Sequence, residues 1–149
     1  MTHTNTIIKL LQLEADGDSG EAMNYLSDNY KMTWMYKTKN KTFPQVKVDK
    51  DFKNKMEEVY AYKQREYKIY SILENDNIVT AEIVESYYDG SKNIRHVTPI
   101  AFVWTFDEDG EVETGKHYCD PDISYESLEE YDFDILYGHK PIIIIKSKE

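Results

Sequence analysis

The spacing of the apolar residues changes early in the chain from a helical period to an alternating one. In residues 5–15 the apolar side chains recur three and four positions apart, which predicts a helix with one buried stripe. A second helix is expected from Asp18, an N-cap residue followed three positions later by Glu21, and to run through Tyr30. From Lys31 onward, apolar and polar residues alternate, which is typical of strands.

One further helical segment interrupts the strands. Asp49 or Asp51 can cap it, and its apolar residues fall on one face over 52–60. Four strands are then expected, over residues 66–73, 79–87, 94–106 and 111–120. Turn-forming sequences separate them at 74–77, 89–92 and 107–110. Because consecutive strands with short turns form an antiparallel meander, we predict an α+β fold with an antiparallel sheet packed on three N-terminal helices.

The residues after 122 are interpreted as a C-terminal extension, 123–149, to a domain that spans 1–122. Pro121 ends the last strand of the meander, because proline cannot donate to the ladder. Ser124–Tyr131 is a candidate short helix, and Ile142–Ile145 is a strand-like apolar run. Since an exposed apolar edge promotes aggregation, we expect this extension to pack on the domain or on a dimer partner.

Charge and composition exclude several classes of protein. The formal net charge is −10, whereas a nucleic-acid-binding protein needs a basic surface. Cys119 is the single cysteine, so no internal disulfide can form, which is typical of a reducing compartment. No apolar run approaches the ~20 residues of a membrane span, and the N-terminus lacks a secretory signal pattern. We therefore expect a cytoplasmic protein that binds neither nucleic acid nor a membrane.

Two segments carry a resemblance to a known family. Residues 109–120 resemble the closing pattern of the SnoaL-like polyketide cyclases in the nuclear transport factor 2-like superfamily: Asp-Gly, a hairpin strand, then Tyr-x-Asp. Leu26–Trp34 is similar to the family's second helix running into its first strand, and the resemblance covers residues 3–122. It implies a cone, in which a strongly curved sheet wraps the helices and leaves a cavity at its open end. Some members are cyclases, isomerases or dehydratases, and others only bind ligands or proteins, so the resemblance implies fold more than reaction.

The alternation of the last two long strands gives a candidate catalytic pair. Pairing through the turn at 107–110 places Phe106 near Val112, Trp104 near Thr114, Ile100 near Tyr118 and Thr98 near Asp120. Asp120 and His96 then share one face. In an apolar cavity Asp120 would be a general acid or base, with His96 as its partner. The alternatives are an aspartate that caps a turn before Pro121 and a strand histidine with a purely structural role.

Other residues on the predicted inner face are candidates for contact with a ligand. Aromatic side chains supply contact area and a few polar tips, although plain core packing explains them as well. Glu85 is an acid on an otherwise apolar strand face and needs a partner if it is buried. The candidate ligand-binding residues are Trp34, Tyr36, Glu85, Trp104 and Tyr118.

The sequence contains neither a glycine-rich phosphate loop nor a complete set of metal ligands. His117 and Cys119 lie two residues apart, but no second pair completes a tetrahedral site, and alternation places His117 on the face opposite Asp120. We expect no cofactor and no metal. Three hypotheses therefore stay open: a cofactor-independent isomerase, cyclase or dehydratase; a module that binds a small apolar or aromatic molecule; and a dimeric interaction module.

We also expect a homodimer. The outer face of the last strands offers Val97, Ala101, Val103 and Gly115, and the apolar extension adds to it. Members of the resembled family commonly pair through the sheet. Sedimentation that shows a monomer at micromolar concentration and above would contradict this prediction.

Overall fold

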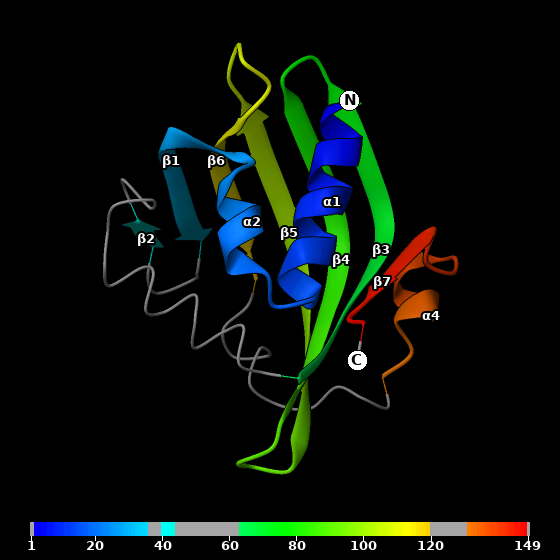
Figure 1. Ribbon diagram of the computed structural model, residues 1–149. Helices are drawn as coiled ribbons and strands as arrows, with labels where there is room; N and C mark the ends of the chain where they lie inside the picture. Colours follow the sequence, from blue (N-terminus) through cyan, green and yellow to red (C-terminus); the bar gives the residue numbers. More distant parts are fainter. Residues whose placement is uncertain (1, 36–39, 44–62, 120–130, 149) are drawn as a thin grey trace.

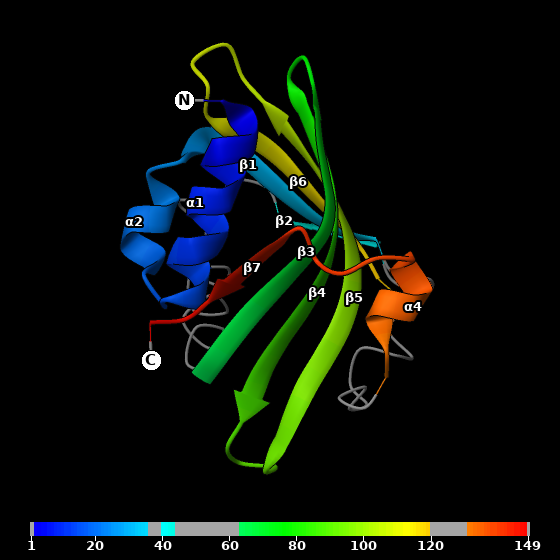
Figure 2. The same cartoon turned by 90° about the vertical axis from the view of Figure 1, so that its right-hand side faces the viewer.

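A single mixed sheet carries helices on both of its faces. The computed structural model describes residues 2–35, 40–43, 63–119 and 131–148. In this part, helices α1 (His3–Ala15) and α2 (Ser19–Met23) lie on one face of the sheet, the inner face, and α4 (Phe133–Tyr137) lies on the outer face (Figures 1 and 2). The strands are β1 (Leu26–Met35), β2 (Asn40–Phe43), β3 (Lys63–Asn75), β4 (Ile78–Asp89), β5 (Ile94–Phe106), β6 (Val112–Tyr118) and β7 (Ile143–Lys146).

The strand order is β2-β1-β6-β5-β4-β3-β7. Strands β3 to β6 form the antiparallel meander that alternation predicts, with turns at the expected places. The expectation of a wholly antiparallel sheet is wrong, because β1 pairs with β6 in parallel. Strands β2 to β5 lie between these two strands in the chain and supply the long connection that a parallel pair requires. Figure 2 shows the long strands bending around α1 and α2.

The second helix is much shorter than its apolar spacing predicts. Its start is confirmed, because the Asp18 side chain accepts a hydrogen bond from the backbone N–H of Glu21 at 3.1 Å. It ends at Met23, however, and β1 begins at Leu26 rather than at Lys31. The edge of β6 supplies backbone partners there: the N–H of Val112 donates to the Tyr25 carbonyl at 2.9 Å. Pairing with a distant strand thus overrides the local helical spacing.

The third expected helix, over 49–62, lies outside the described residues. So does most of the candidate helix at 124–131. The run Ile142–Ile145 does form a strand: β7 pairs antiparallel with β3 at the edge of the sheet, and Gln12 of α1 donates to the Lys146 carbonyl at 2.9 Å. The described part of the extension therefore packs on the domain itself.

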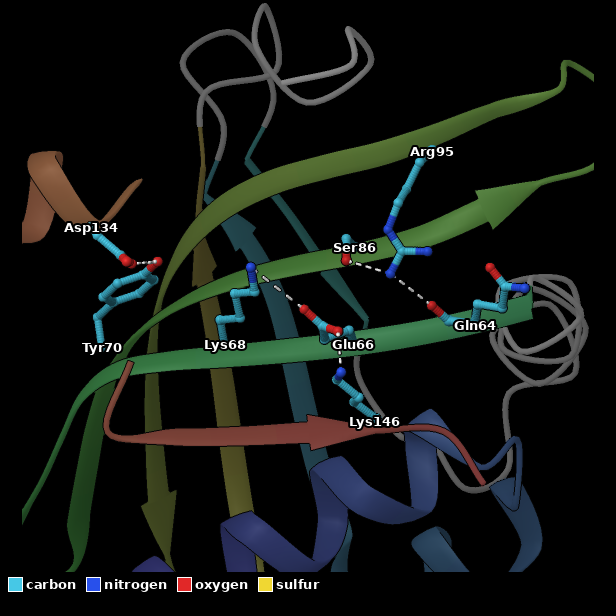
Figure 3. Close-up of polar contacts among 8 residues, drawn as sticks. All are labelled: Gln64, Glu66, Lys68, Tyr70, Ser86, Arg95, Asp134 and Lys146. Atoms are coloured by element: carbon cyan, nitrogen blue, oxygen red, sulfur yellow. Dashed lines mark hydrogen bonds and ion pairs between the residues drawn. The ribbon is translucent and has the colours of Figure 1, made fainter. Parts of the chain in front are cut away.

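Helix α4, which the sequence pattern did not indicate, is fastened to the outer face. The side chain of Asp132 caps its N-terminus. The Tyr70 hydroxyl donates to Asp134 at 2.8 Å (Figure 3), and Phe133 packs with Tyr70, Val84 and Val97. Part of the outer face that we expected to form a dimer interface, at Val97, is thus covered by the chain's own extension.

Polar side chains on the outer face tie neighbouring strands together, as Figure 3 shows. Arg95 of β5 reaches across β4, where it donates to Ser86 at 2.8 Å and to the Gln64 carbonyl of β3 at 3.0 Å. Glu66 lies 3.8 Å from both Lys68 and Lys146. Such ion pairs with solvent-accessible lysine side chains contribute little each to stability.

The main core lies between the helices and the inner face. Ile7 and Leu11 of α1 share this core with alternate residues of β4. Among the described residues, no helix is long and apolar enough to cross a membrane. The alternation that predicted the strands is the burial pattern observed: Val79, Ala81 and Ile83 are buried, and the residues between them face outward.

One extra residue in β6 changes which of its side chains face inward. Phe106 pairs with Val112 as predicted, but Thr105 pairs with Thr114, so Glu113 forms a β-bulge. The predicted pairing is wrong beyond this point: Trp104 lies opposite Gly115, Phe102 opposite His117, and Ala101 opposite Tyr118. Gly115 and His117 therefore share the inner face with Trp104. A Cβ atom at Gly115 would lie 2.5 Å from the Tyr30 hydroxyl oxygen, which puts Gly115 on the inner face and not on the expected dimer face.

The close contact at Gly115 generates a prediction about stability. The Gly115→Ala substitution forces the buried Tyr30 ring to move and should cost about 1–3 kcal/mol of unfolding free energy. Gly20→Ala is the matched control: nothing lies within 4 Å of its added methyl group, and alanine favours the α2 helix by up to ~1 kcal/mol. Urea unfolding measures both. A Gly115→Ala variant as stable as the wild type would contradict this packing.

Candidate functional site

A cavity opens between the helices and the inner face of β1, β5 and β6. The space inside it that is open to small molecules is about 40 Å³. Most of its wall is apolar, and three polar side chains, Glu14, Tyr30 and His117, reach it. The apolar lining residues of the described chain are Leu10, Leu11, Ala22, Met23, Leu26, Met32, Phe102 and Trp104. An apolar pocket with a few converging polar groups is the usual form of a small-molecule site.

Glu14 is the acid of this cavity. It follows Leu10 and Leu11 on the apolar stripe of α1 and lines the cavity, where the residue is partly buried. Burial raises the pKa of Glu14 to about 7, against a hydrogen bond from Tyr67 that favours the ionised form. The Tyr67 hydroxyl donates to Glu14 Oε2 at 2.9 Å. Near neutral pH this carboxyl group can therefore both hold and release a proton.

His117 and Tyr30 stay uncharged beside it. Burial lowers the pKa of His117 to about 4, so its imidazole is neutral at pH 7 and can donate or accept one hydrogen bond. Burial, and the charge of Glu14, raise the pKa of Tyr30, so its hydroxyl remains a phenol. At neutral pH these two groups therefore bring no net charge to the cavity.

A buried ion pair lies behind Tyr67. The Arg65 side chain is 2% exposed, and its Nη1 lies 3.1 Å from Glu85 Oε2. Its guanidinium stacks over the Tyr87 ring, 4.7 Å from the ring centroid. Glu85 lies directly opposite Tyr67 on the neighbouring strand. The acid that the sequence pattern left without a partner is thus paired with Arg65, and the described lining residues of the cavity do not include it.

The aromatic candidates fall into three places. Trp104 is 3% exposed and lines the cavity. Trp34 is partly buried and packs against the core beside it, opposite His117 on the neighbouring strand. Tyr118 is 40% exposed and lies opposite Ala101 on the outer face, because the bulge at Glu113 reverses the alternation. Its predicted place on the inner face is therefore wrong.

His96 lies on the predicted face but in a different cluster. It is 5% exposed, its Nε2 lies 3.3 Å from Asp89 Oδ2, and the Tyr87 ring packs beside it. This cluster sits at the β4–β5 hairpin end of the sheet, and His96 is not among the described residues that line the cavity. Asp120 and Tyr36 lie outside the described residues, so the Asp120–His96 pair stays a prediction.

An acidic group occupies the β5–β6 turn. Oxygen atoms of Asp107, Asp109 and Glu111 lie within 4.8 Å of one another. Asp107 Oδ1 accepts hydrogen bonds from the backbone N–H groups of Asp109 and Glu111, each at 2.9 Å. These bonds give Asp107 a structural task, since aspartate commonly stabilises turns in this way.

Sequence reasoning missed Glu14 and placed His117 on the wrong face. The signal for Glu14 was present: it continues the apolar stripe three positions after Leu11 and four after Leu10. An acid at such a position is either solvated at the stripe's edge or buried for a reason. For His117 no local signal existed, since the residues from Glu113 to Lys116 are polar or small and fit either face.

No protein-family model and no curated protein matches the sequence. Solved structures do match. An NTF2-like protein of unknown function from Cytophaga hutchinsonii is 19% identical, has a TM-score of 0.54, and is matched over 77% of this chain and 96% of its own. A protein described as a putative SnoaL-like polyketide cyclase, from Shewanella denitrificans, is 8% identical, with a TM-score of 0.66 over 81% of this chain and 92% of its own.

The enzyme SalBIII, described as epoxide hydrolase/cyclase-like, has a TM-score of 0.68 at 7% identity, over 81% of this chain and 92% of its own. At these identities the likeness concerns the fold alone. The chain thus has the NTF2-like fold that the resemblance implied, and the reactions of its structural neighbours are not carried over.

The shifted pKa values of Glu14 and His117 give opposite dependences of stability on pH. The folded protein retains a proton on Glu14 between pH 4.5 and about 7, where the unfolded chain releases it. Glu14 therefore lowers stability as the pH rises through this range. The unfolded chain binds a proton at His117 between pH 6.5 and about 4, where the folded protein does not. His117 therefore raises stability with pH in its range, and the two effects partly cancel in the wild type.

We predict that the Glu14→Gln substitution separates these two effects on stability, because it removes the titration of Glu14 and leaves that of His117. Its unfolding free energy minus that of the wild type should rise between pH 4.5 and 7, by up to ~1.4 kcal/mol per pH unit. Urea unfolding at several pH values measures this difference. Glu108→Gln, which removes the same charge from an exposed turn position, should give a constant difference. A constant difference for Glu14→Gln as well would contradict the raised pKa of its carboxyl group.

Proposed function

We propose that this protein binds a small, partly apolar, uncharged molecule in the inner cavity and moves a proton on it without a cofactor. The observation that carries the proposal is an acid with a pKa of about 7 in the wall of an apolar cavity. The ideal catalytic pKa lies near the working pH, and reaching it requires burial of the kind found at Glu14.

The roles of the residues follow from their charges. Glu14 takes a proton from the bound molecule or gives one to it. Tyr30 and His117 donate hydrogen bonds to an oxygen atom on which negative charge develops, since a neutral phenol and a neutral imidazole both have N–H or O–H groups to offer. Phe102 and Trp104, whose rings stack with centroids 4.9 Å apart, supply a flat apolar wall.

The class of reaction is proton transfer next to a carbonyl or hydroxyl group, as in an isomerase, cyclase or dehydratase. The SnoaL-like cyclase and the putative isomerase from Rhodopseudomonas palustris share the fold, the latter with a TM-score of 0.66 at 10% identity. They support the proposal as neighbours in fold, while Glu14 supplies the chemical argument. The second candidate function, a module that binds without catalysis, uses the same cavity.

The test uses a panel of small neutral aromatic ketones and phenols. Quenching of Trp104 fluorescence in a Trp34→Phe background reports binding, because Trp104 lines the cavity and the chain has 2 tryptophans. NMR in D₂O then reports exchange of the protons next to the carbonyl of a bound ketone. We expect Glu14→Gln to keep affinity within a few-fold and to slow exchange by ~10²-fold or more, since general acid–base groups contribute that much.

Each outcome decides between the hypotheses. Glu108→Gln should exchange at the wild-type rate. Binding without exchange would favour the module that only binds, and a Glu14→Gln variant with the wild-type exchange rate would contradict the role of Glu14. Asp120→Asn in the same assay tests the acid/base role proposed for Asp120: if it is required, exchange falls while the fold and the affinity persist.

A further inference from the structure

One tyrosine, Tyr67, donates a hydrogen bond to the Glu14 carboxyl group. Tyr67 is 2% exposed and extends from the inner face of β3 to the α1 helix, where its hydroxyl meets Glu14 Oε2 at 2.9 Å. Arg65, two residues earlier on the same strand, pairs with Glu85, which lies directly opposite Tyr67 on β4. Tyr67 is the donor in the bond to Glu14, so its O–H is directed at the carboxyl group.

This directionality assigns the proton of the acid to a particular atom. Glu14 Oε2 accepts from Tyr67, so in the neutral acid the proton sits on Oε1. The tyrosine therefore prevents one carboxyl oxygen from carrying the proton and stabilises the ionised form when Oε1 loses it. A carboxyl group in an apolar cavity without such a donor would have no fixed orientation.

The charges of Arg65 and Glu85 act on Glu14 in opposite directions. The positive charge of Arg65 favours an ionised Glu14, and the negative charge of Glu85, 3.1 Å from Arg65, opposes it. The other titratable groups around Glu14 come from β1 and β6, as Tyr30 and His117. Lys146 of β7 lies 3.8 Å from Glu66, and Lys148, which follows the strand, lies 3.6 Å from Asp16. Helix α2 contributes the apolar Ala22 and Met23 to the same cavity.

We propose that Tyr67 is a positioning residue for the Glu14 carboxyl group, and that the Arg65–Glu85 pair sets how strongly the tyrosine favours the ionised form. The inference rests on the proposed function only in assigning Glu14 a chemical task. Tyr67 and Glu85 themselves do not line the cavity in the described part of the chain, so they act through Glu14.

The test is a ¹³C NMR titration of the Glu14 carboxyl carbon in the full chain, assigned by the signal that Glu14→Gln removes. Tyr67→Phe removes a donor to the ionised form and should raise the midpoint pH by roughly half a unit or more. Glu85→Gln removes a negative charge and leaves Arg65 unbalanced, so it should lower the midpoint. Glu82→Gln, on the outer face of the same strand, removes an equal charge and should leave the midpoint unchanged.

A merely structural role for Tyr67 predicts a different pattern. Loosened packing lets water reach Glu14, which lowers the midpoint in every destabilised variant, because desolvation is what raised it. A midpoint that falls or stays constant in Tyr67→Phe would overturn the inference. Should Tyr67→Phe fail to fold, Glu85→Gln decides alone: an unchanged or raised midpoint overturns the inference, and so does a lowered midpoint that comes with a loss of stability in urea. A lowered midpoint at the urea stability of Glu82→Gln supports the inference.

The titration needs no bound molecule, so it is independent of the proposed function. Opposite midpoint shifts without any ketone exchange would uphold the positioning of Glu14 and contradict the catalytic proposal. Proton exchange that depends on Glu14, together with titration midpoints that do not change in Tyr67→Phe and Glu85→Gln, would support the catalytic proposal and contradict the positioning of Glu14. Where both hold, the pH at which exchange reaches half its maximal rate should shift in the same direction as the midpoint in each variant.

Discussion

The bulge at Glu113 determines what the cavity contains. Two residues of β6 stand opposite one of β5 at this point, so every side chain after it changes face. His117 enters the cavity, Gly115 leaves room for the Tyr30 hydroxyl, and Tyr118 goes to the outer face. Because β1 pairs in parallel with β6, the inner-face residues Met32 and Trp34 are aligned with Gly115 and His117. A strand without the bulge would place Thr114 and Lys116 toward the core.

The second constraint is an acid on the apolar face of α1. Burial makes the charge of Glu14 unfavourable, and one hydroxyl group with a balanced ion pair behind it offsets part of that cost. Leucine at this position would pack against the same sheet without such a cost. A carboxyl group there lowers stability, and a strongly shifted pKa of this kind is common at functional sites.

Local patterns predicted those parts of the molecule whose neighbours in space are also neighbours in sequence. Helix α1 and strands β3 to β5 follow from spacing, because the stripe on α1 is continuous and the turns between the long strands are short. The position of Trp104 on the inner face could be predicted for the same reason. Residues 24–30 were misassigned because Leu26 and Tyr30 fit a helical stripe as well as a strand, and a distant edge of β6 decides between them.

The site was less predictable than the fold. The residues around the bulge, Glu113 to Lys116, are polar or small and fit either face, so alternation could not locate the extra residue. Without the register, His117 and Tyr118 could not be placed. Glu14 could have been found, because an acid inside an apolar stripe is a local anomaly. Its partner Tyr67 could not, since the two residues lie 53 positions apart in the chain.

The central claim is that the cavity holds a carboxyl group that is largely protonated just below neutral pH. Infrared spectroscopy detects this directly, because a protonated carboxyl group has a carbonyl band that an ionised one lacks. Wild type at pH 6 should show such a band, it should fade as the pH rises through about 7, and Glu14→Gln should lack it. Identical carboxyl bands in wild type and Glu14→Gln at pH 6 would show that Glu14 is ionised there, and would contradict the account.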